Sequence, residues 1–207
     1  VEIKLREYQE EVFAKVVAHF RSKDGHLPAV VDMSVGSGKT ALAAFLAKHS
    51  ADKGGRVMIL ARQGELVQQD GEFAEMIGVK VSYYSASLGA KSVRHNVIAG
   101  TEGTVARQLD KAFKSWLPDL VLVDECHQAD HEDENTMMMR IMLHFQVLNP
   151  KVRILGLTGS PFRGTETIIG DFWSKCLACV PTEFLVGEGW LVPVHFGWPE
   201  HDEDSID

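Results

Sequence analysis

Short apolar runs alternate with longer stretches whose apolar residues recur at helical spacing along most of the chain. The runs have the length of buried strands, and the intervening stretches have the length of helices. The strands are predicted at 29–33, 56–60, 80–83, 96–100, 119–123 and 152–157. The helices are predicted at 7–20, 39–51, 64–76, 104–113 and 135–147. Strands that alternate with helices predict an α/β fold with a mostly parallel, doubly wound sheet and helices on both faces.

A glycine-rich segment links the first predicted strand to the second predicted helix. Gly36 and Gly38 allow the backbone to turn so that successive N–H groups point inward, and the helix N-terminus adds a positive partial charge. Lys39 would then place its ammonium on the β- and γ-phosphates of a nucleoside triphosphate, and Thr40 would give its hydroxyl to Mg²⁺. The predicted phosphate-binding residues are Ser34, Val35, Gly36, Ser37, Gly38, Lys39 and Thr40.

This predicted P-loop departs from the strict pattern at one position. G-x-x-x-x-G-K-[ST] requires a glycine at position 33, where this chain has Met33. A glycine-rich turn before an ordinary helix is therefore the alternative. The order of strand, loop and helix is the one that the motif needs, so we favour the P-loop.

Two carboxylates, Asp124 and Glu125, follow the apolar run at 119–123. Ligands bind beyond the carboxyl ends of the strands in open parallel sheets, which is where this pair would lie. Asp124 would hold Mg²⁺, and Glu125 would orient or deprotonate the attacking water. An acidic pair after a strand is commonly structural, but together with a P-loop it predicts a triphosphatase. Its catalytic residues would be Lys39, Asp124 and Glu125.

The sequence Asp-Glu-Cys-His at 124–127, together with the P-loop, resembles the first RecA-like lobe of superfamily 2 helicases and translocases, whose second motif reads DEAD, DEAH or DECH. The resemblance implies a RecA-like P-loop NTPase domain over residues 1–193. It implies that Gln9 reads the edge of adenine, with Arg6 close by, so that ATP is preferred. It also implies that residues 194–207, with an acidic tail, begin a linker toward a second RecA-like lobe. Without that lobe, ATP hydrolysis would be slow or absent.

Three further segments resemble superfamily motifs: 59–69, 97–104 and 157–163. The first two resemble motifs that grip nucleic-acid phosphates, although many relatives have a glutamine where this chain has Gly103. They imply nucleic-acid contacts from Arg62, Gln63, Thr101 and Thr104. The third resembles the motif that couples hydrolysis to movement along a strand. The residues implied in coupling are His127, Thr158 and Ser160.

Within the superfamily, the segments 104–107, 123–127 and 155–163 are most similar to the bacterial RadD group of DNA-repair ATPases. This similarity implies DNA rather than RNA as the partner. The leading hypothesis is therefore an ATP-dependent DNA helicase or translocase that uses Mg²⁺. One alternative is an RNA-directed ATPase of the same superfamily. Another is a nucleotide-sensing switch or defence-system scaffold without productive turnover, although a pure binder has no need of Glu125.

Composition changes this picture little. The 207 residues are 45% apolar, which is enough for one domain with a full core. A net charge of −8 argues against a broad nucleic-acid-binding surface, although a few basic and amide groups on one face can still hold a strand. No apolar stretch is long enough to span a membrane and no export signal starts the chain, so a cytoplasmic location without a membrane partner is expected.

Three cysteines do not make a disulfide framework, and a reducing compartment fits. Cys176 and Cys179 have the spacing of half a zinc site, but a structural site needs four ligands, and His195 is a distant single candidate. We therefore expect both thiols to lie in the core rather than on a metal. Cys126 is expected to have no nucleophilic role.

Overall fold

The computed structural model describes residues 3–128, 136–163, 165–170 and 172–193. Eight strands form one sheet in the order β10-β1-β7-β6-β2-β5-β3-β4, and all neighbours are parallel except β3 and β4. The strands are β1 (Ala29–Met33), β2 (Val57–Ala61), β3 (Val81–Ser85), β4 (Ala90–Lys91), β5 (Val97–Thr101), β6 (Leu120–Val123), β7 (Arg153–Thr158) and β10 (Lys175–Val180). A separate antiparallel hairpin joins β8 (Phe162–Arg163) to β9 (Glu166–Thr167).

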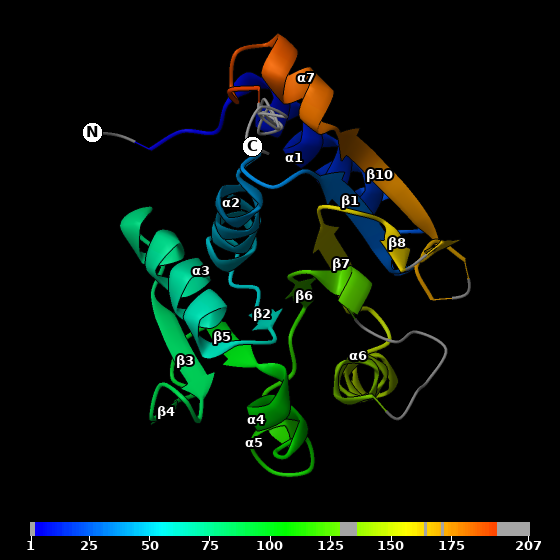
Figure 1. Ribbon diagram of the computed structural model, residues 1–207. Helices are drawn as coiled ribbons and strands as arrows, with labels where there is room; N and C mark the ends of the chain where they lie inside the picture. Colours follow the sequence, from blue (N-terminus) through cyan, green and yellow to red (C-terminus); the bar gives the residue numbers. More distant parts are fainter. Residues whose placement is uncertain (1–2, 129–135, 164, 171, 194–207) are drawn as a thin grey trace, which may run out of the picture.

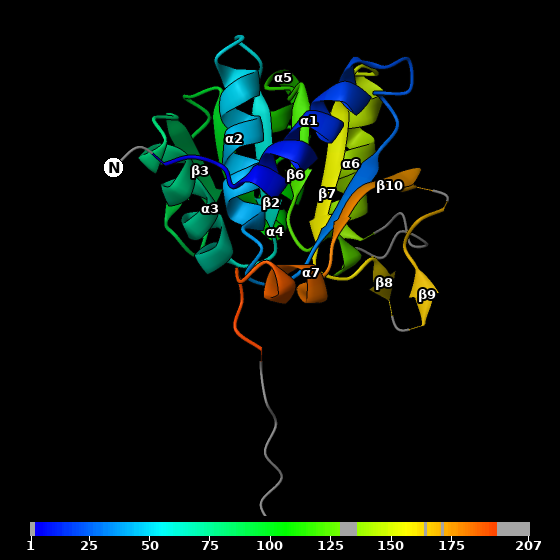
Figure 2. The ribbon, with the colours of Figure 1, turned by 90° about the horizontal axis from the view of Figure 1, so that it is seen from above.

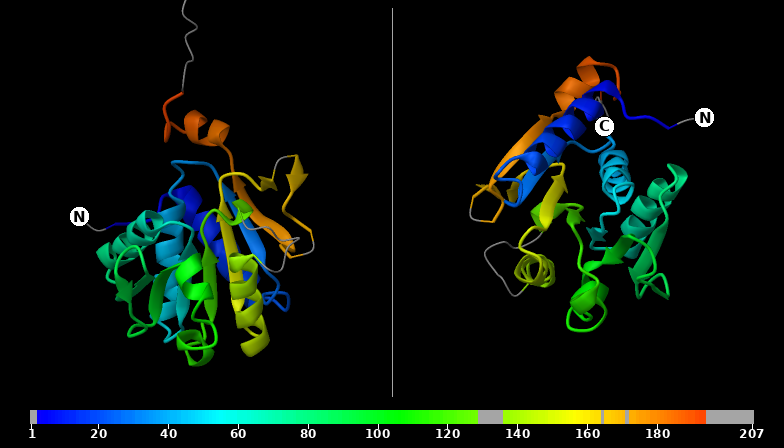
Figure 3. Two further views of the ribbon diagram at one scale, coloured as in Figure 1. Left: turned by 60° about the horizontal axis from the view of Figure 1, so that its bottom comes forward. Right: turned by 180° about the vertical axis from the view of Figure 1, so that it is seen from behind.

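Helices cover both faces of the sheet (Figures 1 and 2). On one face lie α1 (Glu7–Arg21), α2 (Lys39–Ala51) and α3 (Gly64–Met76). On the other lie α4 (Glu102–Ala106), α5 (Ala112–Ser115) and α6 (Met137–Leu148). The short helices η1 (Cys126–Gln128) and α7 (Thr182–Gly187) follow the ends of β6 and β10. The view from behind in Figure 3 shows the same layers, so the predicted doubly wound α/β fold is confirmed.

Successive side chains of the buried strands point to opposite faces of the sheet, so the structure has two cores, one on each face. Val31 and Ile59 pack with α1, α2 and α3, whereas their neighbours Val30 and Met58 pack with the helices of the other face. A strand buried on both sides must be apolar at every position, which is why the sequence shows continuous runs rather than alternating ones. Because these strands are buried on both faces, the sequence located them well: the ends of the predicted strands lie within two residues of the observed ends.

The sequence predicted one helix at 104–113, and this prediction is wrong because the structure has two short helices there. Helices α4 and α5 are separated by a turn, and Lys111 before α5 has a non-helical backbone with φ −119° and ψ −97°. The turn is closed by hydrogen bonds such as that from Lys111 N to Gln108 O, at 3.1 Å. Leu109 in this turn and Phe113 in α5 both enter the second core.

The expected core position of Cys176 and Cys179 is also wrong. Both thiols are exposed on the edge strand β10. Ala178 and Val180 enter the first core, but no described residue of β10 belongs to the second, because no helix covers that face at this edge. Cys179 Sγ donates to Asp32 Oδ2 at 3.1 Å instead. His195 and the predicted linker at 194–207 lie outside the described residues.

None of the described helices combines the length and the apolar composition needed to cross a membrane.

Gly156 of β7 provides a test of packing in the second core. A Cβ added there would lie 2.5 Å from Cys126 Sγ and 3.0 Å from a ring carbon of Trp173. Gly156→Ala is therefore expected to lower the free energy of unfolding by about 1–3 kcal/mol, measured by urea denaturation. The control is Gly170→Ala, whose added Cβ meets nothing within 4 Å. It should change stability by less than about 0.5 kcal/mol. Equal effects of the two substitutions would contradict this account.

Candidate active site

The P-loop leaves β1 at the carboxyl edge of the sheet. Ser34 anchors its start, since its backbone N and Oγ donate to Val180 O of β10 at 3.1 and 3.0 Å. Gly36 and Gly38 have φ values of 80° and 82°, a left-handed conformation that glycine adopts without a steric penalty. A side chain at Gly38 would also collide with Gln9 Nε2. Both glycines are therefore required by the shape of the loop, as the sequence predicted.

Lys39, the first residue of α2, joins this loop to the end of β6. Its Nζ donates to Met33 O at 3.2 Å and lies 3.5 Å from Glu125 Oε1. Met33 stands where the strict motif has glycine, and its side chain is fully buried in the first core. Because Met33 reaches Lys39 through its carbonyl, which every residue has, the departure from the motif leaves this contact intact.

Asp124 and Glu125 lie side by side beyond β6. Glu125 has φ 47° and is the only non-glycine residue with a positive φ among those that the structure describes. Such backbone strain costs about 1–3 kcal/mol and collects at functional sites. Burial, and then the negative charge of Glu125, raises the pKa of Asp124, while Lys39 opposes the shift. The end of β6 therefore concentrates negative charge in a poorly solvated place.

These donors fit Mg²⁺. Thr40, the second residue of α2, offers a hydroxyl oxygen, and Asp124 offers a carboxylate. Mg²⁺ prefers oxygen ligands and is usually held by one or two carboxylates with water and substrate phosphates. Burial, and then the charge of Glu125, raises the pKa of Asp124 despite Lys39 and His127, so a bound divalent cation would stabilise its anion further.

A polar chain runs from Glu125 to β7. His127 Nδ1 lies 3.3 Å from Glu125 Oε2 and 2.7 Å from Thr158 Oγ1. Thr158 is fully buried; its hydroxyl donates to Ser160 O at 2.8 Å and accepts from Ser160 N at 3.1 Å. The structure thus brings together the three residues that the resemblance implied in coupling.

The first turn of α1 packs against the P-loop. Gln9 is buried, and its Nε2 donates to Ser37 O at 2.7 Å while its Oε1 accepts from Arg6 N at 2.9 Å. Tyr8 OH donates to the same Ser37 oxygen at 2.7 Å, and the Arg6 guanidinium lies 4.5 Å from the ring centroid of Trp190. Gln9 therefore lies against the P-loop with Arg6 beside it. The adenine contact that the resemblance implied for Gln9 stays a prediction. Tyr8 and Trp190, whose ring centroids lie 6.1 Å apart, were not predicted as part of the site. Their only signal in the sequence was the position of Tyr8 beside Gln9.

A third carboxylate escaped the sequence analysis. Asp70 on α3 is only 5% exposed, and its side chain hydrogen-bonds the Thr40 side chain. Burial, and then the negative charge of Asp124, raises the pKa of Asp70 to about 7. In the sequence it is one of several acidic residues on a helix with ordinary amphipathic spacing. No motif distinguishes it from its exposed neighbours.

The implied nucleic-acid contacts line a groove of about 610 Å³ beside the start of α3 and α4. Thr101 and Thr104 are buried in its wall, where Thr101 Oγ1 donates to Thr104 Oγ1 at 2.8 Å. The exposed basic and amide groups are Arg62, Gln63 and Arg107, of which Arg107 was not predicted, and the exposed Glu65 lies on the same rim. The structure therefore does not place the two threonines where a strand could reach them directly, and the side chains at the rim are the better candidates.

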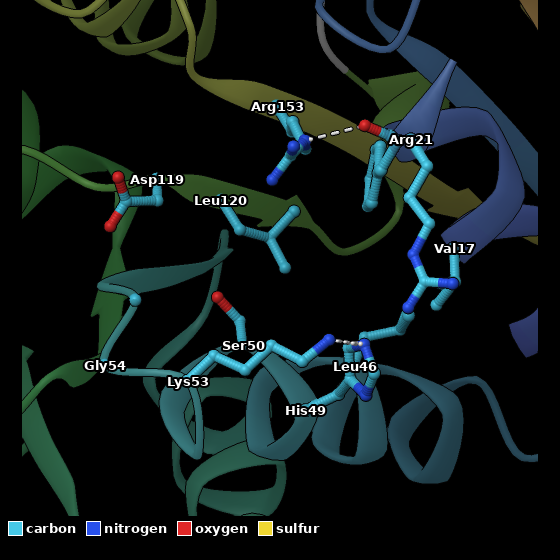
Figure 4. A pocket seen from close by; sticks show the side chains of 12 residues that line it. Val17, Arg21, Leu46, His49, Ser50, Lys53, Gly54, Asp119, Leu120 and Arg153 are labelled. Atoms are coloured by element: carbon cyan, nitrogen blue, oxygen red, sulfur yellow. Dashed lines mark hydrogen bonds between the residues drawn. The ribbon is translucent and has the colours of Figure 1, made fainter.

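A second groove, of about 490 Å³, lies at the ends of α1 and α2 and away from these motifs (Figure 4). Two of its basic side chains, Lys53 and Arg153, already make contacts within the fold. Lys53 Nζ is 2.7 Å from His49 Nε2, and Arg153 Nε donates to Phe20 O at 3.1 Å. Cations beside the last turns of helices also complement the negative end of the helix dipole. This groove contributes nothing to the candidate active site.

A family profile described as "Type III restriction enzyme, res subunit" matches residues 2–163. The chain belongs to this family. The matched region contains the P-loop, Asp124, Glu125 and the polar chain through Thr158, so every strand-end residue of the candidate active site lies within it. Comparison of the chain with curated protein sequences gives no significant match.

Solved structures of helicases and restriction-modification enzymes share the fold of this chain. A nuclease-deletion mutant of the Type ISP restriction-modification enzyme LlaGI, in complex with a DNA substrate mimic, gives a TM-score of 0.65 at 14% identity, over 91% of this chain and 21% of that one. The Hef helicase domain of Pyrococcus furiosus gives 0.62 at 25% identity, over 78% and 34%. The UvsW helicase of bacteriophage T4 gives 0.60 at 20% identity, over 77% and 54%.

These comparisons confirm the RecA-like fold and the likeness to superfamily 2 helicases. The chain spans from 21% to 54% of the length of these three neighbours.

The raised pKa of Asp70 has a consequence for stability. The folded chain keeps the Asp70 proton up to about pH 7, whereas the unfolded chain releases it near the ordinary value of 3.8. Stability should therefore fall as the pH rises through this window. Without nucleotide and Mg²⁺, Asp70→Asn should match the parent protein near the acid end of the window and become increasingly more stable than it toward pH 7, by a few kcal/mol at most.

Thermal and urea unfolding across this pH range would measure the effect. The exposed Asp52→Asn at the end of α2 is the matched control and should leave the pH profile unchanged. A stability difference between Asp70→Asn and the parent protein that stays constant with pH would contradict the assignment.

Proposed function

We propose that this domain is the ATP-binding lobe of an ATP-dependent DNA helicase or translocase. The observation that carries the proposal is the position of Lys39, directly after the P-loop, whose Nζ lies 3.5 Å from Glu125 Oε1. A phosphoryl transfer site needs a cation for the phosphate oxygens and a carboxylate for the attacking water, at nearly the same place. The domain presents both at one edge of the sheet.

Nucleotide binding would change the partner of Lys39. In the structure its ammonium is held by Met33 O and Glu125. A γ-phosphate would take the place of Glu125, which frees the carboxylate to orient water and accept its proton. Thr40 and Asp124 would hold Mg²⁺, which neutralises phosphate charge when bound. The N–H groups of the loop and the N-terminus of α2 would bind the remaining phosphate oxygens.

The exchange of the Lys39 partner would also affect β7. Glu125 also contacts His127, which in turn contacts Thr158. When the carboxylate turns from Lys39 toward water, this hydrogen-bonded chain must adjust, and the backbone at Ser160 is bonded to its last member. This chain supports the proposed roles of His127, Thr158 and Ser160 in coupling.

DNA is the proposed partner. In support, one neighbour of this fold was solved with a DNA substrate mimic, and the Hef and UvsW neighbours are helicases. Likeness to the RadD group, an adenine contact by Gln9, a second RecA-like lobe and a cytoplasmic location belong to the same proposal. An RNA-directed ATPase and a non-hydrolysing switch are the alternatives that the experiments below separate.

Substitutions at Lys39 and Glu125 in the full-length protein test the chemistry. Lys39→Ala should abolish both ATP binding and turnover, because it removes the cation from the phosphate site. Glu125→Gln should keep ATP binding but slow hydrolysis by about 10²–10⁴-fold, the usual contribution of a general base. Lys48→Ala, on the exposed side of α2, is the control and should change neither. Unaltered turnover in Glu125→Gln would refute the role given to that residue.

Hydrolysis should be measured with single-stranded DNA, duplex DNA and RNA. Stimulation by DNA that is lost in Lys39→Ala is the expected result. Stimulation by RNA alone would identify the RNA-directed alternative, and ATP binding without any stimulation would identify the switch.

The rim of the groove near α4 tests the DNA contact. Arg107→Ala should weaken DNA binding and reduce the dependence of log K on log salt by about one, because one phosphate contact is lost. Arg62→Ala should have a smaller effect, since Arg62 Nε is already 3.3 Å from Glu102 Oε1. Arg94→Ala removes an equal charge elsewhere on the surface and should leave the salt slope unchanged. Fluorescence anisotropy with labelled DNA would measure all three, and a similar loss in Arg94→Ala would count against the groove.

A further inference from the structure

Asp70 is buried beside the proposed Mg²⁺ ligands without a cation of its own. Its side chain faces the Thr40 side chain and is close to Asp124. Among the described residues, no Lys or Arg forms an ion pair with it. Lys39 is the nearby lysine of the site, and it is already bound to Met33 O and Glu125. Burying an uncompensated carboxylate is costly, so its presence here needs a physical reason.

The chemistry of a hydroxyl ligand supplies such a reason. The Thr40 hydroxyl has one proton and two lone pairs. When a lone pair binds a metal ion, the proton must be donated away from the ion. The Asp70 carboxylate lies in hydrogen-bonding contact with that hydroxyl, on the side of α3, and only accepts hydrogen bonds when ionised.

The local charge supports the same conclusion. Asp70, Asp124 and Glu125 contribute three negative charges when ionised, and Lys39 contributes one positive charge. A divalent cation bound beside these carboxylates would offset part of this negative charge. Charges in a buried place are poorly screened by solvent, so this compensation is stronger than it would be on the surface.

We propose that Asp70 is a positioning residue for the divalent cation of the nucleotide site. It accepts the proton of the Thr40 hydroxyl, directs Thr40 Oγ1 toward the cation, and adds a negative charge behind it. The proposal rests on the proposed function, because it requires that the P-loop binds a complex of nucleotide and metal.

The test measures binding rather than turnover. A fluorescent ATP analogue is titrated into the protein at a series of free Mg²⁺ concentrations, and in EDTA without Mg²⁺. Removing a group that hydrogen-bonds a metal ligand typically lowers metal affinity by about 10–100-fold. Asp70→Asn is therefore expected to raise the Mg²⁺ concentration for half-maximal binding by about this factor. It should leave affinity in EDTA unchanged, which also shows that the variant is folded.

Two further variants separate positioning from a merely structural role. Asp70→Ala removes the acceptor entirely and should shift the Mg²⁺ midpoint at least as far as Asp70→Asn. In a Thr40→Val background, Asp70→Asn should add little, because the two residues act through one hydroxyl. Asp52→Asn, at the exposed end of α2, is the matched control and should leave the midpoint unchanged.

The outcomes are distinct. An unshifted Mg²⁺ midpoint in Asp70→Asn, with Mg²⁺-dependent binding intact in the parent protein, would overturn the role of Asp70 alone. Additive effects of Asp70→Asn and Thr40→Val would overturn the route through the Thr40 hydroxyl. Absence of Mg²⁺-dependent nucleotide binding in the parent protein would overturn the proposed function and this inference together.

Discussion

The contact of the Lys39 ammonium with Met33 O and the Glu125 carboxylate is the interaction on which the site depends. It joins the loop after β1 to the end of β6, two strands that are separated in the sheet by β7. The contact is possible only because parallel strands place all their carboxyl ends at one edge. This contact depends on the strand order, on the positive φ of Gly36 and Gly38, and on the positive φ of Glu125.

Much of this arrangement could be predicted because its signals are local. A strand buried on both faces must be continuously apolar, and a loop that surrounds phosphate must have glycines where φ is positive. Gly36 and Gly38 have positive φ, and the strands before and after them lie where the apolar runs indicated. Residues 124–127 could be placed near the P-loop because both motifs follow buried strands, and parallel strands end at the same edge of the sheet.

The features that escaped prediction depend on contacts between distant segments. Cys176 and Cys179 have an apolar setting in the sequence, but their exposure depends on β10 being an edge strand with one uncovered face. Asp70 resembles any acidic residue of an amphipathic helix until α2 and α3 pack together and bury it beside Thr40. Burial of a polar group is a property of the tertiary structure, and helical spacing alone does not report it.

The polar chain explains how one carboxylate could serve both catalysis and movement. Glu125 is shared between Lys39, on the phosphate side, and His127, on the side of β7. A change in the partner of Lys39 therefore alters the charge that His127 and Thr158 face, with no need for a long-range distortion of the core. Thr158 is fully buried and bonded to the backbone of Ser160, so a rearrangement of its hydroxyl would change its hydrogen bonds to the chain after β7. Coupling in this domain would then begin with the exchange of a single ion-pair partner.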